Sequence, residues 1–116
     1  MGDAPLPAWA NEWMAAPGAP DPEVAAWMRS RPAPVQALMR RLPPACLVRA
    51  TVPLRCPAPG RVGILYSYTE GGEVSVLSAP DGGLRAFCQP AVLEPVGYRY
   101  GLTPERVAAI LDGREG

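Results

Sequence analysis

Aromatic residues next to arginine are the residues of this chain best suited to recognition chemistry. Tyr98, Arg99 and Tyr100 are consecutive, and Tyr66 and Tyr68 lie close together earlier in the chain. Tyrosine and arginine anchor many protein interfaces, and both can stack on nucleobases. This group therefore indicates a surface that binds a protein or contacts nucleic acid.

The same tyrosines could instead have structural roles within the domain. Tyr66 alternates with Val62 and Ile64, so we expect its side chain in the core. Tyr98 and Tyr100 could cover one end of a sheet beneath a C-terminal helix. For these two residues the sequence leaves both interpretations open.

Two other groups are candidates for partner contacts. Arg40 and Arg41 follow a helical apolar stripe, where they could meet phosphate or an acidic partner, or could simply complement the helix dipole. Trp9 and Trp13 are four residues apart, as on one face of a helix. The predicted partner-binding set is Tyr68, Tyr98, Arg99, Tyr100, Arg40, Arg41, Trp9 and Trp13.

The composition argues against the common kinds of catalysis. The chain has no histidine, so it cannot build a Ser-His-Asp, Cys-His or HExxH arrangement. Its 11 basic residues are all arginine, which excludes a lysine Schiff base and the P-loop lysine. No two carboxylates have a spacing that predicts a facing pair of acids. We therefore expect a protein that is not an enzyme and that has no cofactor.

Charge and cysteine content narrow the partner classes. The net charge is zero and the pI is about 6.2, whereas a dedicated nucleic-acid-binding domain is usually strongly basic. Cys46, Cys56 and Cys88 form no CxxC pair and have no histidine to complete a zinc site. We expect no metal, and we interpret the cysteines as small buried side chains.

The sequence also predicts where the protein resides. Its first residues, MGDAPLPAWANEW, lack a basic start and a continuous apolar run, so they do not resemble a secretory signal. No stretch approaches 18 apolar residues, so no membrane span is expected. We expect a cytoplasmic protein, and the all-arginine basic set with many Ala, Gly and Pro residues is typical of a GC-rich bacterial, archaeal or phage genome.

Residues 1–43 form a predicted Pro-rich arm of short helices. Val24, Trp27 and Met28 make one helical stripe, and a second stripe runs from Val35 to Leu42. Asp21, Pro22 and Glu23 are typical of a helix start. Helices this short are unstable alone, so their stripes must dock either on the rest of the chain or on a partner.

Residues 44–100 change to the alternating pattern of β-strands. The predicted strands are 46–51, 61–68, 73–78, 84–89 and 93–96, separated by turn residues that include Glu70-Gly71-Gly72 and Asp81-Gly82-Gly83. Several short strands in so few residues favour a small barrel or a strongly bent sheet, because closure removes exposed edges.

Residues 101–116 contain the clearest helix signal. Thr103 is a predicted N-cap, Pro104 is the first helical residue and Gly113 ends the helix. The three regions together predict one compact α+β unit: a small antiparallel β-barrel with short N-terminal helices and one C-terminal helix.

The middle region resembles an SH3-like small barrel of the kind seen in KOW and related domains. The resemblance rests on the first strand at 46–50, the Gly60-Arg61-Val62-Gly63 start of the second strand, the glycine hairpin, the Val-Ser-Val strand, and the turn at 89–92 before the last strand. In such barrels a glycine at the place of Gly63 permits the bend that closes the sheet. The resemblance covers about half the chain and transfers no site residue.

Departures from the subfamilies of this fold limit the functional prediction. SH3 domains that grip PxxP peptides use a tryptophan beside tyrosines, but here all tryptophans lie outside the barrel region. KOW domains that contact RNA tend to be basic, and this region is nearly neutral. We therefore expect a non-catalytic interaction or adaptor module that binds a protein partner or a larger assembly. The alternative is a nucleic-acid-associated accessory factor that uses an Arg/Tyr surface.

Overall fold

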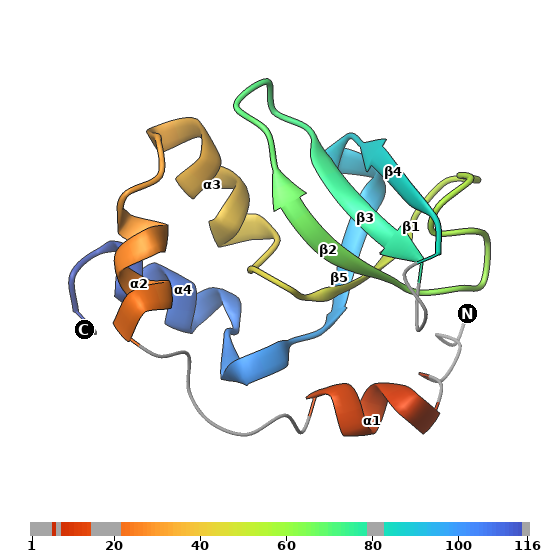
Figure 1. The fold of residues 1–116 in the computed structure, drawn as a ribbon, viewed down its shortest axis with the longest axis horizontal. Helices are drawn as coiled ribbons and strands as arrows, with labels where there is room; N and C mark the ends of the chain where they lie inside the picture. Colours follow the sequence, from red (N-terminus) through yellow and green to blue (C-terminus); the bar gives the residue numbers. More distant parts are fainter. Residues whose placement is uncertain (1–5, 7, 15–21, 79–82, 115–116) are drawn as a thin grey trace.

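The computed structural model describes residues 6, 8–14, 22–78 and 83–114, which form a five-stranded antiparallel sheet and four α-helices (Figure 1). The helices are α1 (Ala8–Met14), α2 (Pro22–Arg29), α3 (Ala33–Arg41) and α4 (Pro104–Leu111). The strands are β1 (Leu47–Ala50), β2 (Gly63–Tyr68), β3 (Val74–Ser78), β4 (Arg85–Cys88) and β5 (Leu93–Gly97). Two single 3-10 turns, η1 (Pro90–Val92) and η2 (Arg99–Gly101), precede and follow β5.

The strand order is β4-β3-β2-β1-β5. The first four strands form a meander, and β5 returns to pair with β1 on its other side. Because β4 and β5 stand at opposite ends of this order, the sheet is antiparallel as predicted but is not closed into a barrel. The predicted barrel closure is therefore wrong. Closure would have removed the exposed strand edges, but here the edge strands β4 and β5 are only four and five residues long, so little unpaired main chain is exposed without it.

Local sequence accounts for the ends of the C-terminal helix. The Thr103 hydroxyl accepts a hydrogen bond from the Arg106 amide (3.3 Å), and Pro104 follows it as the first residue of α4. Gly113 has a positive φ of 77°, a conformation that favours glycine at the end of a helix. The predicted N-cap Asp21 and the predicted turn residues Asp81 and Gly82 lie outside the described residues.

Two apolar clusters form the core. The sheet cluster consists of Leu42, Cys46, Val48, Cys56, Leu65, Val74, Val76, Cys88 and Leu93. The helix cluster consists of Ala25, Met28, Val35, Met39, Leu102, Val107 and Ile110, from α2, α3, α4 and the segment before α4. Figure 1 shows these three helices gathered beside the sheet. Most of the described arm therefore packs on its own chain.

A β-bulge changes the predicted alternation in β2. Leu65 pairs with Val76 and Tyr68 with Val74, so two residues of β2, Tyr66 and Ser67, lie opposite the single residue Ser75 of β3. The extra residue shifts the phase of the strand, so that Leu65 and Tyr68 both face the core. Tyr66 instead has 59% of its surface exposed, and its predicted burial is wrong.

Candidate interaction surface

Tyr68 joins the two halves of the core. Its side chain packs against both the sheet cluster and the helix cluster. Its hydroxyl donates a hydrogen bond to the Leu42 carbonyl oxygen, 2.5 Å away, just after α3 ends. Burial raises the pKa of this phenol far above its usual range, so it stays protonated. The structure thus gives Tyr68 a role inside the domain.

Arg99 contacts the N-terminal helix α1 from the 3-10 turn after β5. Its guanidinium lies 5.0 Å from the centre of the Trp13 ring and 4.9 Å from that of Tyr100. These are cation–π distances. Trp13 belongs to α1, so the contact connects the start of the chain to η2. Tyr100, at φ 61°, also packs against the helix cluster.

The remaining candidates also have surroundings within the chain. Tyr98 packs against the sheet cluster, and Trp9 is half-buried in α1. Arg40 forms a salt bridge of 2.6 Å with Asp112, which connects the last turn of α3 to the end of α4. Arg41 is exposed beside it. The structure thus places the eight predicted residues around several internal contacts and not on one surface, and their role toward a partner stays a prediction.

The outer face of the sheet carries a different aromatic group. Tyr66 of β2 is 59% exposed and Phe87 of β4 is 56% exposed. The guanidinium of Arg85 lies 5.0 Å from the Tyr66 ring centre and 5.2 Å from the Phe87 ring centre. Beneath them, the hydroxyls of Ser67 in β2 and Ser75 in β3, the strand between β2 and β4, are 2.6 Å apart and form a hydrogen bond. Two exposed rings are thus held by one arginine on a firmly hydrogen-bonded support.

A cleft extends this group toward the helices. It has a volume of about 280 Å³ and is lined by Trp27, Arg31, Pro32, Val35, Tyr66, Ser67, Tyr68 and Glu70. Trp27 of α2 is 43% exposed, and Arg31 lies 5.7 Å from its ring centre. The turn that carries Arg31 is fixed because the Gln36 side-chain amide donates to the carbonyl oxygens of Arg29 (3.0 Å) and Arg31 (2.9 Å).

We call the continuous group Trp27, Arg31, Tyr66, Arg85 and Phe87 the aromatic face. The sequence pattern does not reveal this face, because the spacing predicts Tyr66 in the core and Trp27 in a buried stripe. In α2 the buried residues are Ala25 and Met28, and Trp27 lies outside them. One available signal was the pair Arg85 and Phe87, which share one face of a short strand near its turn.

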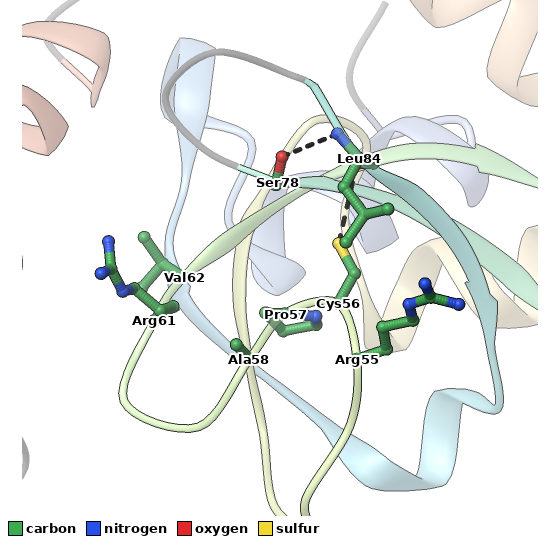
Figure 2. Close-up of a pocket in the computed structure, with 8 residues that line it drawn as sticks. All are labelled: Arg55, Cys56, Pro57, Ala58, Arg61, Val62, Ser78 and Leu84. Carbon is green, nitrogen blue, oxygen red and sulfur yellow. Dashed lines mark hydrogen bonds between the residues drawn. The ribbon is translucent and has the colours of Figure 1, made fainter.

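A second pocket lies between the loop at 51–62 and the start of β4 (Figure 2). It has a volume of about 350 Å³ and is lined by Arg55, Cys56, Pro57, Ala58, Arg61, Val62, Ser78 and Leu84. Figure 2 shows the guanidinium groups of Arg55 and Arg61 on opposite sides, pointing away from each other. Since they do not converge, they do not form a common anion site.

The thiol in this pocket faces main-chain oxygens. The Sγ atom of Cys56 lies 3.6 Å from the Val76 carbonyl oxygen and 3.7 Å from that of Leu84. Burial raises the pKa of Cys56, which disfavours the nucleophilic thiolate. Cys46, Cys56 and Cys88 are all buried and free of disulfides. The geometry gives this cysteine the environment of a packed side chain.

Within the described residues, no group of three or more His, Cys, Asp or Glu side chains could hold a metal ion. None of the described helices is long and apolar enough to cross a membrane. The sequence matches no family model, no curated protein and no solved structure.

Proposed function

We propose that this chain is a non-catalytic interaction module that binds a protein partner through the aromatic face. The observation that carries the proposal is the exposure of three rings, Trp27 (43%), Tyr66 (59%) and Phe87 (56%), each with an arginine stacked on it. Exposed tryptophan, tyrosine and arginine side chains at a pocket are the typical anchors of protein interfaces.

Preorganisation supports the same proposal. Arg31 and Arg85 already lie over rings, so binding would lose little side-chain entropy at these positions. Glu70 lines the same cleft as Arg31, so the surface offers both signs of charge beside apolar rings. Such a mixture suits a protein surface better than a uniformly charged polyanion.

We also propose a more specific class for the fold, an SH3-like arrangement. The 3-10 turn η1 falls within the turn at 89–92 on which the SH3-like resemblance rests, and the sheet is antiparallel as that resemblance implies. These features support an SH3-like arrangement whose sheet has remained open. In this proposal the sheet carries Tyr66 and Phe87, and the helices supply the tryptophan that the sheet region lacks.

Affinity capture with matched variants tests the proposed function. The immobilised chain is exposed at about 1 µM to an extract of its native host, beside Tyr66→Ala and Val52→Ala. Val52 is 44% exposed but lies in the loop after β1, off the aromatic face. We expect a protein that is retained by the natural chain and by Val52→Ala and is lost, by about tenfold or more, with Tyr66→Ala. Equal capture by all three would contradict the proposal.

One observation favours the nucleic-acid alternative. Tyr66 and Phe87 are exposed on a sheet, with Arg85 between them, and exposed rings beside arginine can stack on unpaired bases. Fluorescence anisotropy with labelled single-stranded RNA and DNA measures this directly. Binding at about 50 mM salt that falls steeply with added salt would support an accessory factor, and no binding at that salt would remove it.

A further inference from the structure

The hydrogen-bond phase of β3 shows which main-chain groups of β4 face outward. The Ser78 amide donates to the Leu84 carbonyl oxygen (2.7 Å), which makes these two residues a hydrogen-bonded pair. Such pairs alternate along an antiparallel ladder, so the next one is Val76 with Ala86. The N–H and C=O groups of Arg85 and Phe87 therefore point away from β3, toward the side where β4 has no neighbouring strand among the described residues.

The opposite edge of the sheet is blunted. The Thr51 amide donates to the Val92 carbonyl oxygen (2.8 Å), so the same alternation pairs Arg49 with Glu94 and turns residues 93 and 95 of β5 outward. Residue 95 is a proline, which has no N–H to offer a further strand. Strand addition is thus disfavoured at β5, whereas β4 has no proline and keeps both outward N–H groups.

The side chains along β4 are complementary to a second copy of the same strand. When two β4 strands run antiparallel about a two-fold axis through Ala86, Arg85 of each copy faces Phe87 of the other. These residues would exchange four main-chain hydrogen bonds. Within one chain the Arg85 guanidinium lies 5.2 Å from the Phe87 ring centre, and the pairing would bring the same two groups together across the axis.

The residue on the axis fits this arrangement. Residues at a non-hydrogen-bonded position bring their Cα atoms to within about 4.5 Å of each other. Ala86 has a small side chain, so two copies can approach without a clash. The contact would also cover part of the ring of Phe87, which is 56% exposed in the single chain.

We propose that a second copy of this chain pairs with β4, joining two sheets edge to edge. This inference rests on the proposed function, because it names a second copy of the chain as one partner of the aromatic face, on its β4 side. The paired strands have only four residues each, so the contact is small and the dimer is weak, with a dissociation constant of about 100 µM. Trp27 and the cleft beside it stay open in the dimer.

Analytical ultracentrifugation of the full chain tests the pairing. Between about 5 µM and 1 mM we expect the natural protein to shift from monomer to dimer. Phe87→Pro removes one outward N–H and one ring without touching the ladder to β3, and it should raise the dissociation constant by about tenfold or more. Far-UV circular dichroism confirms that the variant is folded.

Disulfide trapping locates the axis independently. In Ala86→Cys the two introduced thiols lie within disulfide range, so we expect rapid dimer crosslinking on mild oxidation. Gln89→Cys is the matched control: it is exposed and follows the same strand, but it lies three residues from the axis and should not crosslink. Crosslinking of Ala86→Cys alone supports the pairing even where Phe87→Pro fails to fold.

Two results would overturn the inference. One is a natural protein that stays monomeric at 1 mM. The other is a dimer that is neither weakened by Phe87→Pro nor trapped by Ala86→Cys. Either outcome is separable from failure of the proposed function, because affinity capture is performed at about 1 µM, where the chain is monomeric. A monomer that still captures a host protein through Tyr66 leaves the proposed function standing.

Discussion

Replacing Tyr68 by phenylalanine removes only a hydroxyl group, whose hydrogen is donated to the Leu42 carbonyl oxygen. That carbonyl follows the end of α3, where a helix leaves its last C=O groups without helical partners. In Tyr68→Phe it loses this partner in a place that the two apolar clusters surround. Leaving a buried acceptor unsatisfied costs about 1–3 kcal/mol.

Urea unfolding followed by circular dichroism measures this cost. A chain of this size has an unfolding slope of about 1–1.5 kcal/mol per molar urea, so we expect the midpoint to fall by about 1 M or more. The matched control is Tyr66→Phe, which removes the same group from a ring that is 59% exposed and should change the free energy of unfolding by less than about 0.5 kcal/mol. Equal midpoints for the two variants would refute a structural role for the Tyr68 hydroxyl.

Three other predictions follow from packing and burial. Gly63→Ala places a Cβ atom 2.3 Å from Val76 Cγ1, so the free energy of unfolding should fall by about 1–3 kcal/mol, whereas Gly71→Ala, 3.8 Å from its nearest neighbour, should leave it unchanged in the same urea assay. Burial raises the pKa of Cys46 to about 12, well above that of an unfolded thiol, so above about pH 9 the unfolded state loses this proton first. The free energy of unfolding should then fall by about 1.4 kcal/mol per pH unit up to about pH 12, and Cys46→Ala should make this fall shallower; an unchanged slope would contradict the assigned burial. All three cysteines are buried, so a thiol reagent should modify them only after denaturation, and rapid labelling of the native protein would be the contrary result.

Local patterns in the sequence predicted most of the secondary structure. The alternation at 46–51, 73–78 and 84–89 located β1, β3 and β4 to within one residue, because each strand is bounded by turn residues. The Thr103 cap and Gly113 fixed both ends of α4. These signals depend on neighbours in the chain, so they can be read without knowing the tertiary packing.

The candidate surface depends on information that the local pattern does not contain. Leu65 faces the core opposite Val76, so its neighbour Tyr66 points outward, and one extra residue after Tyr66 returns Tyr68 to the core. A bulge of this kind arises from strand pairing and not from alternation. In α2, Trp27 met the spacing of a buried stripe, but Ala25 and Met28 occupy the positions that face α3 and α4. The smaller alanine allows closer helix packing, which leaves the large ring at the rim of the cleft. The prediction of a closed barrel was wrong for a related reason. Whether the edge strands β4 and β5 pair with each other depends on the whole sheet and not on the local pattern.

Two of the arginine stacks, those of Arg99 and Arg85, separate stability from recognition. Arg99 lies between Trp13 and Tyr100 and connects α1 to η2, so its loss should loosen the N-terminal helix and lower the free energy of unfolding. Arg85 lies over two rings that are both more than half exposed, so Arg85→Ala should leave that free energy within about 0.5 kcal/mol and act on association instead.

Comparing Arg99→Ala with Arg85→Ala in urea unfolding and in sedimentation therefore tests the division of roles directly. If Arg85→Ala lowered the free energy of unfolding as much as Arg99→Ala and left association unchanged, the rings over the sheet would be part of the scaffold. The opposite pattern is expected because a cation–π contact between exposed groups contributes only about 0.5 kcal/mol, whereas the Arg99 contact connects α1 to η2. Tyr66, Arg85 and Phe87 sit on strands that β3 already holds in place, so their stacking is free to serve a partner.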